Sequence, residues 1–482
     1  MANLEEFKQT NMSDALLAAL TLDRTLPAPL AAQVYDALRA LIADGRLKAG
    51  SALPASRPFA AELGVSRATV VAAYDQLVAE GYAEGRRGSG VYVGDIGAVP
   101  APAAAAAPSE RRRPLAAPSP PVAFDPGVPD MRAFPYRAWG RTVARTARAT
   151  PEALVQETEA FGDPDLRAEI ARHLAEWRGV EARPEQIIVT AGAGDALEIA
   201  IRTLAGPGDA VGLEDPGYLP LREFVLGLGL RPLWLDVDAE GAAPPPAGDP
   251  PGLSILTPSH QFPLGGAMPT SRRFAFLNFA EATGAWLVED DFDSEFRYAG
   301  RPIPALASLD RGGRVIYVGS FSKVFSMGLR LGYMVAPEAL LPAFRDTLER
   351  RSRPKASAAL QRPLAAFMAE GEFHRHIRRM RRIYAERYRA FLGLLTASVG
   401  GRFAWEESQA GMQIALRLEE GADDAALSRL AAEAGVRCPP LSRYRARPGG
   451  PRGLLLGFCA CEPAEMAEGF ARLEQVLARW DG

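Results

Sequence analysis

The chain has 482 residues, which exceeds the size at which one hydrophobic core usually stops growing, so two or three domains are expected. Hydrophobic residues make up 48% and charged residues 23% of the sequence, and no apolar run approaches the roughly 18 residues needed to cross a bilayer, which disfavours a membrane protein. The formal net charge of −3 means that nucleic-acid binding would have to come from a local basic surface.

The N-terminal residues 1–25 do not resemble a secretory signal, because acidic side chains replace the basic start and no long apolar run follows. The cysteines Cys438, Cys459 and Cys461 are expected to be buried reduced thiols. None of the four histidines stands at zinc-ligand spacing from them, so no metal site is predicted. We therefore expect a cytoplasmic protein.

Residues 56–81 (SRPFAAELGVSRATVVAAYDQLVAEG) predict two helices joined by a tight turn at Gly64. Ala60 is small enough for a close helix crossing, and Val70 would pack back into the angle. Ser66 is a good N-cap for the second helix. The exposed N-terminal end of that helix is the part of a helix-turn-helix that enters the major groove. The side chains expected there are those of Ser66, Arg67 and Thr69.

Residues 82–93 (YAEGRRGSGVYV) predict a two-stranded hairpin, or wing, whose turn carries Arg86, Arg87 and Gly88. Glycine lets backbone approach a phosphate and arginine supplies positive charge. A plain helical pair with a hairpin is the alternative, because residues 27–95 hold seven basic and seven acidic side chains.

The joint pattern from Pro29 onward resembles the N-terminal domain of the GntR family of bacterial regulators almost position by position, over PLAAQVYDALRALIADGRLKAGSALPASRPFAAELGVSRATVVAAYDQLVAEGYAEGRRGSGVYV. The resemblance implies a winged helix-turn-helix domain over residues 27–94 that binds double-stranded operator DNA. The implied DNA contacts are Arg57, Ser66, Arg67, Thr69, Arg86 and Gly88.

Residues 95–122 are dominated by alanine and proline (VPAPAAAAAP at 99–108) and predict a semi-stiff linker. Beyond it, residues 123–482 form the second predicted domain. Apolar, β-rich runs alternate there with helical stretches, which argues for a parallel sheet with helices on both faces. The predicted strands are 186–190, 210–213, 253–257, 285–289 and 314–318. Ligands of such sheets gather at the carboxyl ends of the strands.

Lys323 is the sharpest chemical candidate, because it follows the last of these runs within Ser320-Phe321-Ser322-Lys323 and precedes Arg330. A lysine among small hydroxyls at a strand end suits an imine to a carbonyl cofactor, with the cofactor phosphate held beside it. A lone lysine would more often be a solvated surface charge.

Three further features fit a pyridoxal 5'-phosphate (PLP) site. Asp290 ends another predicted strand and could keep a pyridine nitrogen protonated. The turn around Gly192 and Ala193 leads from a strand into a helix and offers backbone N–H groups to a phosphate. Tyr218 could stack on the ring. Each feature alone could equally be an ordinary connection or packed loop.

In order, the motifs TAGAGDAL, EDPGY, TPSHQFPLG, VEDDFDSEF and SFSKVFSMGLRLGY resemble the fold-type I aminotransferase-like domain of the MocR subfamily of GntR regulators. The resemblance implies that Lys323 forms the internal aldimine, that Asp290 meets the pyridine nitrogen and that Tyr218 lies against the ring. It places Ser320, Ser322 and Arg330 at the phosphate. Arg452 matches the arginine that receives a ligand carboxylate, and Arg222 is a second candidate.

The sequence departs from the family pattern beside the cofactor. Phe292 stands where the family usually has a tyrosine, and Phe262 where aminotransferases keep an asparagine, so two hydrogen bonds to the cofactor's phenolic oxygen are lost. Gly194 and Asp195 replace a pair of glutamines in the phosphate loop. We expect PLP binding to survive these changes better than efficient transamination.

These observations predict a PLP-dependent transcription regulator that senses an amino compound or PLP through an aldimine at Lys323 and controls neighbouring metabolic genes. The resemblance implies a head-to-tail homodimer. One alternative is an active aminotransferase with an appended DNA-binding domain; another is a DNA-binding architectural protein that has lost its cofactor. The arginine-rich residues 375–389 predict a long solvated helix, with an auxiliary DNA-contacting face as the alternative.

Overall fold

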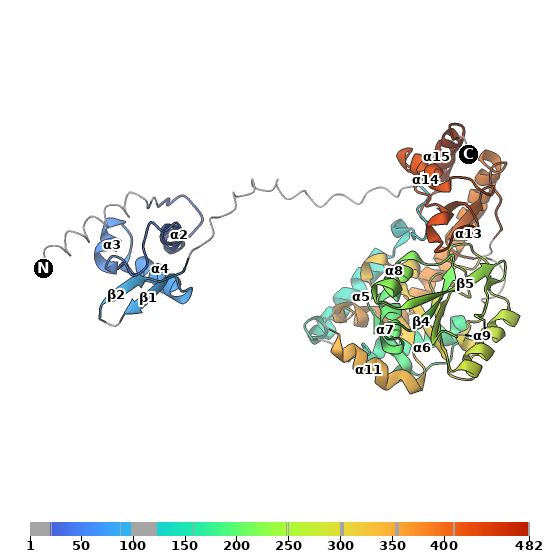
Figure 1. Cartoon of the computed structure of the whole chain (residues 1–482), viewed down its shortest axis with the longest axis horizontal. Coiled ribbons are helices and arrows are strands. Elements are labelled where there is room, and N and C mark those ends of the chain that lie inside the picture. Colours follow the sequence, from blue (N-terminus) through green and yellow to red (C-terminus); the bar gives the residue numbers. More distant parts are fainter. Residues whose placement is uncertain are drawn as a thin grey trace. The chain divides into compact units, whose positions relative to one another are not determined.

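The computed structural model describes residue 20 and residues 22–86, 88–97, 123–156, 158–246, 248, 250–298, 303–351, 356–407 and 410–480. The chain divides into two compact units, Met1–Ala117 and Pro118–Gly482 (Figure 1). Most of the predicted linker, residues 98–122, lies outside the described residues, as does Arg87 of the predicted wing. In the described part of the chain, no helix is long and apolar enough to cross a membrane.

The N-terminal unit is a helix-turn-helix followed by a hairpin. Its elements are α2 (Leu30–Ala43), α3 (Ser56–Glu62), α4 (Arg67–Ala79), β1 (Ala83–Arg86) and β2 (Gly90–Val93). The tight turn between α3 and α4 uses Gly64, whose φ of +63° lies in the left-handed region that favours glycine. Ala60 and Val70 are both buried in the angle between the two helices, as their spacing predicts. The antiparallel hairpin pairs Ala83 with Val93 and forms the predicted wing.

The C-terminal unit is built on an eight-stranded mixed sheet. In spatial order the strands are β3 (Ile187–Thr190), β10 (Gly332–Val335), β9 (Val315–Ser320), β8 (Trp286–Asp291), β7 (Leu253–Leu256), β4 (Ala210–Asp215), β5 (Arg231–Asp238) and β6 (Gly241–Ala242). The strands from β9 to β5 run parallel to one another, as predicted. The sheet as a whole is mixed rather than parallel, because β10 is antiparallel to β9 and β3, and β6 is antiparallel to β5. Only two residues separate β5 from β6, and a connection this short allows only antiparallel pairing.

Alternation along the strands divides the core between the two faces of the sheet. Ile316 and Val318 of β9 face the cluster formed with α7 (Ala193–Leu204), α8 (Leu219–Gly227) and α11 (Leu341–Arg350). Val315 and Tyr317 face the other side, which α9 (Thr270–Thr283) and α6 (Pro164–Arg178) cover. The sheet is therefore covered by helices on both faces.

A smaller lobe completes the C-terminal unit. It contains the antiparallel pair β11 (Gln413–Arg417) and β12 (Gly453–Gly457), with α14 (Asp424–Glu433) and α15 (Pro463–Leu477). The long helix α13 (Glu372–Ser398) packs on α15 and α12 (Ala358–Ala369), and α12 packs on α5 (Tyr136–Ala149) and α6. These elements share one core with β3 and β10, so the smaller lobe is continuous with the large sheet.

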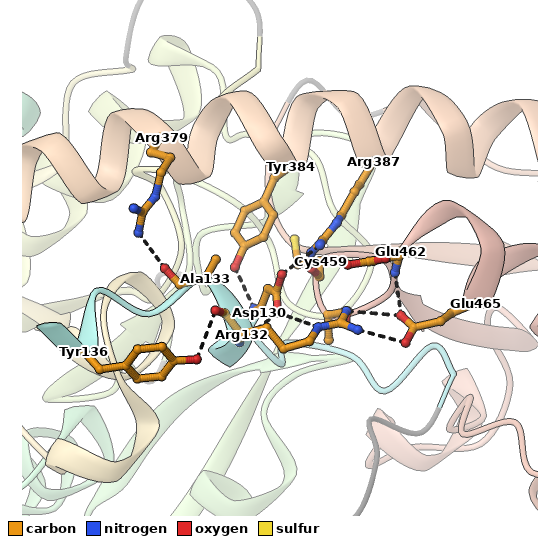
Figure 2. Close-up of polar contacts among 11 residues, drawn as sticks. Asp130, Arg132, Ala133, Tyr136, Arg379, Tyr384, Arg387, Cys459, Glu462 and Glu465 are labelled. Atoms are coloured by element: carbon orange, nitrogen blue, oxygen red, sulfur yellow. Dashed lines mark hydrogen bonds and ion pairs between the residues drawn. The ribbon is translucent and has the colours of Figure 1, made fainter.

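Helix α13 carries the arginine-rich stretch, and part of that stretch holds the chain together (Figure 2). The buried Arg387 pairs with Asp130 at 2.7 Å and also donates to the carbonyl of Cys459. The Asp130 N–H donates to the Tyr384 hydroxyl at 2.9 Å, and Arg379 donates to the carbonyl of Ala133 at 2.5 Å. The expectation of a solvated helix therefore fits only the exposed arginines, which are Arg375, Arg378, Arg379, Arg382 and Arg389.

Candidate functional site

An open cavity of about 620 Å³ lies where β9 ends and α7 begins. It brings together seven of the eight residues that the sequence assigned to a cofactor: Gly192, Ala193, Tyr218, Ser320, Ser322, Lys323 and Arg330. The eighth, Asp290, lines an adjoining pocket together with Tyr218 and Glu214. Residues that are up to 138 positions apart in sequence thus surround one space, because they follow neighbouring strands of the sheet.

The N-terminus of α7 forms one wall of the cavity. Gly192, with φ of +106°, is the N-cap of this helix, so the backbone N–H groups of its first turn are available to an anion. Gly332 at the start of β10 packs against this turn, where a Cβ would lie only 2.6 Å from the carbonyl carbon of Gly192. The unexpected acid Asp195 accepts a hydrogen bond from the Ala191 N–H at 2.9 Å and pairs with Arg351. Arg351 therefore balances a negative charge that would otherwise oppose an anion here.

Lys323 lies in the short helix α10 (Phe321–Val324), whose N-cap Ser320 accepts a hydrogen bond from the Ser322 N–H at 3.1 Å. Its Nζ donates to the carbonyl of Gly127 at 2.6 Å. Burial lowers the pKa of the Lys323 ammonium, against the opposing effect of the Asp293 and Asp125 carboxylates. A lowered pKa increases the share of neutral amine, which is the nucleophilic form.

The two aspartates at the end of β8 have separate environments. Asp291 points to the α6 side of the sheet, where it accepts from the Tyr317 hydroxyl at 2.6 Å and pairs with Arg178 at 2.7 Å. Asp290 points to the opposite side, where its Oδ1 is buried and makes no hydrogen bond to any residue that the structure describes. Burial, followed by the nearby carboxylates of Asp291, Glu214 and Asp293, raises the pKa of Asp290 to about 7. A buried oxygen without a partner among the described residues, in a pocket that shares Tyr218 with the cavity of Lys323, fits the protonated nitrogen of a bound ring.

Aromatic rings border the site. The ring of Phe262 is nearly perpendicular to three neighbouring aromatic rings. Its centroid lies 5.9 Å from the centroids of Tyr218 and Phe292 and 5.1 Å from the centroid of Tyr444. Tyr218 remains 43% exposed, so one side of its ring is available to a ligand. The side chains of Phe262 and Phe292 are hydrocarbon, so they cannot donate a hydrogen bond to a bound molecule.

Comparison with known proteins assigns both units. Residues 30–93 match the family model of bacterial regulatory proteins of the gntR family, and residues 134–473 match that of aminotransferase class I and II. The probable rhizopine catabolism regulatory protein MocR of Rhizobium meliloti is 40% identical over 477 residues, which cover 95% of this chain and 96% of that protein. The chain is a MocR-type regulator of the GntR family.

Other relatives agree with this assignment. The pyridoxine biosynthesis transcriptional regulator PdxR of Corynebacterium glutamicum is 36% identical over 90% of this chain and 92% of that protein. Among solved structures, the α-aminoadipate aminotransferase LysN of Thermus thermophilus, complexed with N-(5'-phosphopyridoxyl)-L-leucine, matches 74% of this chain and 92% of that one, with 28% identity and a TM-score of 0.67. This MocR-type regulator therefore combines a DNA-binding helix-turn-helix unit with a fold-type I aminotransferase-like unit.

The predicted carboxylate-binding arginines of the regulator lie apart. Arg222 lines the pocket that contains Asp290 and Tyr218, and its guanidinium donates to the carbonyl of Arg445. Arg452 is absent from the described lining of these cavities, and its guanidinium lies 3.5 Å from the buried Asp424. Arg443, which the sequence analysis did not single out, lines a cavity of about 600 Å³ with Tyr218 and Phe262. It comes from the smaller lobe, and no local motif marks it.

In the DNA-binding unit, three of the residues predicted to contact DNA lie at the start of α4. Ser66 and Arg67 are exposed there, and Thr69 is half-buried. Ser66 caps α4 by accepting a hydrogen bond from the Thr69 N–H at 3.1 Å, and Arg67 donates to the Ser56 hydroxyl at 3.3 Å. In the wing, the guanidinium of Arg86 lies 4.4 Å from the centre of the Tyr92 ring. Arg57 and Gly88 are exposed. Their roles in DNA contact stay predictions.

Proposed function

We propose that this regulator binds PLP at Lys323, that a small amino compound or PLP itself is its signal, and that occupancy of the site alters how it binds operator DNA near metabolic genes. The buried and unpartnered Oδ1 of Asp290 is the observation that carries the proposal. A carboxylate in this setting is costly unless a cationic group meets it, and a pyridinium nitrogen supplies that partner. The N-terminus of α7, with Ser320, Ser322 and Arg330, would hold the phosphate.

When bound, PLP would supply an aldehyde that captures primary amines. The residues of the chain would then position the reactants. Burial lowers the pKa of the Lys323 ammonium, so its neutral amine would be available to bond to the aldehyde carbon. Tyr218 would cover one face of the ring. Phe262 and Phe292 cannot donate hydrogen bonds to the ring oxygen, so the site is better suited to holding an amine than to rapid transamination. This supports a sensor over an enzyme.

We assign recognition of the effector's carboxylate to Arg443, with Arg222 as a second contact. Arg443 lines the cavity that adjoins Tyr218 and Phe262, whereas Arg452 lies beside Asp424. An arginine fork binds a carboxylate bidentately. Replacing Arg443 with methionine should therefore weaken the response to amino acids but not to simple amines.

We also propose a head-to-tail homodimer. Three apolar side chains are exposed: Leu154 (50%), Val155 (84%) and Met327 (42%). Val155 directly follows the short helix Pro151–Leu154, which packs on α12. Met327 follows α10, which carries Lys323. Exposed apolar side chains of this kind mark interaction surfaces. Sedimentation of the full chain should give twice the monomer mass.

The chain offers a direct test of the cofactor, because it contains only four lysines: Lys8, Lys48, Lys323 and Lys355. The protein is incubated with PLP, reduced with borohydride and digested, and the labelled peptide is identified by mass spectrometry. We expect the phosphopyridoxyl group on Lys323, and no label there or visible absorbance band in Lys323→Ala. Lys48→Ala, in the DNA-binding unit, is the matched control and should behave as wild type. Label spread over the other lysines, or absorbance unchanged in Lys323→Ala, would refute the proposal.

The regulatory half of the proposal is tested with the same proteins. DNA from the promoter region beside the gene is titrated with the regulator in the presence and absence of PLP and of a panel of amino compounds. A change in DNA affinity that disappears in Lys323→Ala supports the proposal, because a ligand can shift an equilibrium only through different affinities for its states. Equal DNA binding under all these conditions would contradict it.

A further inference from the structure

A second cavity, of about 210 Å³, lies between the 259–267 loop and the smaller lobe. It shares no lining residue with the cavity that contains Lys323. Its volume is about seven times the roughly 30 Å³ that one water molecule takes in the liquid, so it can hold a small organic molecule. Its polar lining residues are Ser259, His260, Arg297, Glu406, Glu407 and Gln413.

His260 is the most telling group in this cavity. Its ring is 4% exposed, and its Nδ1 is hydrogen-bonded to the buried Asp293 at 2.9 Å. Its Nε2 is buried and has no hydrogen-bond partner. Burial opposes the charged form of the ring, but the Asp293 carboxylate outweighs this and raises the pKa of His260. The Asp293 carboxylate accepts a hydrogen bond from Nδ1–H and stabilises the protonated ring, which carries a second N–H on Nε2, and the described residues offer no acceptor for that group.

Arg297 provides a second donor of the same kind. It lines the cavity, and its Nε is buried without a hydrogen-bond partner among the described residues. Buried donors without acceptors are rare, because each loses its hydrogen bond to water without gaining one to the protein. Two such nitrogens in one small cavity indicate a missing acceptor, and a carboxylate has oxygens enough for both.

Opposite charge is present on the same wall. Glu406 and Glu407 both line the cavity and are exposed. Glu406 is already paired with Arg417, whereas Glu407 has no ion pair with any residue that the structure describes. A cavity lined by cationic side chains and by an exposed carboxylate matches a molecule with a carboxylate at one end and an ammonium at the other.

We propose that this cavity is a second, noncovalent site for a small zwitterionic amino acid, with its carboxylate on His260 and Arg297 and its ammonium on Glu407. The site is separate from Lys323 chemistry and does not depend on the presence of PLP. It adjoins the first site through the Asp293 carboxylate, which bonds to His260 and also acts on the Lys323 ammonium. Occupancy of one site should therefore alter affinity at the other, and by the same factor in both directions.

The test is calorimetric titration of the full-length protein, freed of any cofactor by dialysis against hydroxylamine. The probes are glycine, L-alanine, β-alanine and 4-aminobutyrate, with propionate and propylamine as analogues that carry a single charge. We expect saturable binding of at least one zwitterion, and binding of the analogues weaker by about tenfold or more. Glu407→Gln and Arg297→Met should each weaken the zwitterion about tenfold. Arg375→Met, on the exposed side of α13, removes an arginine outside both cavities; it is the matched control and should leave this binding intact.

Two outcomes would overturn the proposal. One is that no zwitterion in the panel binds saturably to the wild type. The other is that binding is lost in Arg443→Met and kept in Glu407→Gln, which would place the ligand in the cavity of about 600 Å³. Because Glu407 is exposed, its substitution is compatible with folding and decides the question even where Arg297→Met fails to fold. Thermal unfolding of each variant identifies such a failure.

Discussion

Two carboxylates beside the cofactor cavity are buried without full compensation. Burial raises the pKa of Glu214 to about 7, although this group accepts hydrogen bonds from the N–H and hydroxyl of Thr257. Burial and neighbouring carboxylates raise the pKa of Asp290 to about 7 as well, and its Oδ1 has no partner. Both groups bind protons more tightly in the folded protein than in the unfolded chain. The free energy of unfolding of the cofactor-free protein must therefore fall as pH rises through the interval between the unfolded and folded pKa values.

This gives a prediction for Asp290→Asn. In the cofactor-free protein at about pH 7, the variant should be more stable than the wild type by up to about 4 kcal/mol, since a shift of roughly three units corresponds to that free energy. At about pH 2, below both the unfolded and the folded pKa, the wild-type carboxyl is protonated in both states and this difference should vanish. Urea unfolding across this range measures it. Glu281→Gln, on the exposed surface of α9, is the control and should not change the pH dependence. A variant less stable than wild type at neutral pH would contradict the assignment.

At the scale of elements, the sequence predicts some arrangements and not others. Lys323, Asp290 and Gly192 follow three apolar runs, and the carboxyl ends of such strands share an edge, so their convergence could be expected. The β10 strand could not be predicted to run antiparallel, because its apolar sequence fits either direction. Arg443 reaches the site from the smaller lobe, and Arg387 meets Asp130 across 257 positions; such long-range contacts leave no local periodicity.

Helix α13 provides a matched pair of variants. Arg387→Met leaves the buried Asp130 carboxylate with an uncompensated charge and removes a donor to the Cys459 carbonyl (Figure 2). Breaking a buried pair in this way costs about 3–5 kcal/mol. Arg375→Met, on the exposed side of the same helix, breaks only an ion pair with Glu372 and should cost less than about 1 kcal/mol. Urea unfolding separates the two; equal losses would show that the Asp130 pair does not anchor the 130–136 segment.

Helix α4 gives a prediction for DNA binding. Arg67 is exposed at the first position of this helix, directly after the Ser66 cap. If this end of the helix enters the groove, Arg67→Ala should weaken binding to promoter DNA by about 1–3 kcal/mol. Arg39→Ala, on the exposed side of α2, removes the same charge elsewhere and should change binding by less than about twofold. Fluorescence anisotropy at several salt concentrations tests both, and equal losses would show that charge alone carries the effect.

At the scale of the whole molecule, the DNA-binding unit and the aminotransferase-like unit each possess a hydrophobic core. The core of the first unit contains Val34, Phe59 and Leu77, and all described members of that cluster come from the N-terminal unit. The sheet of the second unit is buried against its own helices. Separate cores allow the two units to unfold in separate transitions, so a ligand that binds one unit need not stabilise the other.

Calorimetry of the full chain with and without PLP tests this arrangement. At a concentration of PLP one hundred times its dissociation constant, the transition of the aminotransferase-like unit should gain about 2.7 kcal/mol, because ligand binding stabilises only the state that binds. That gain corresponds to a rise of several degrees in the midpoint. The transition of the DNA-binding unit should stay where it is, and Lys323→Ala should reduce the shift. A common shift of both transitions would instead mean that the two units unfold as one cooperative body, and that occupancy of the cavity is transmitted to the helix-turn-helix through direct packing.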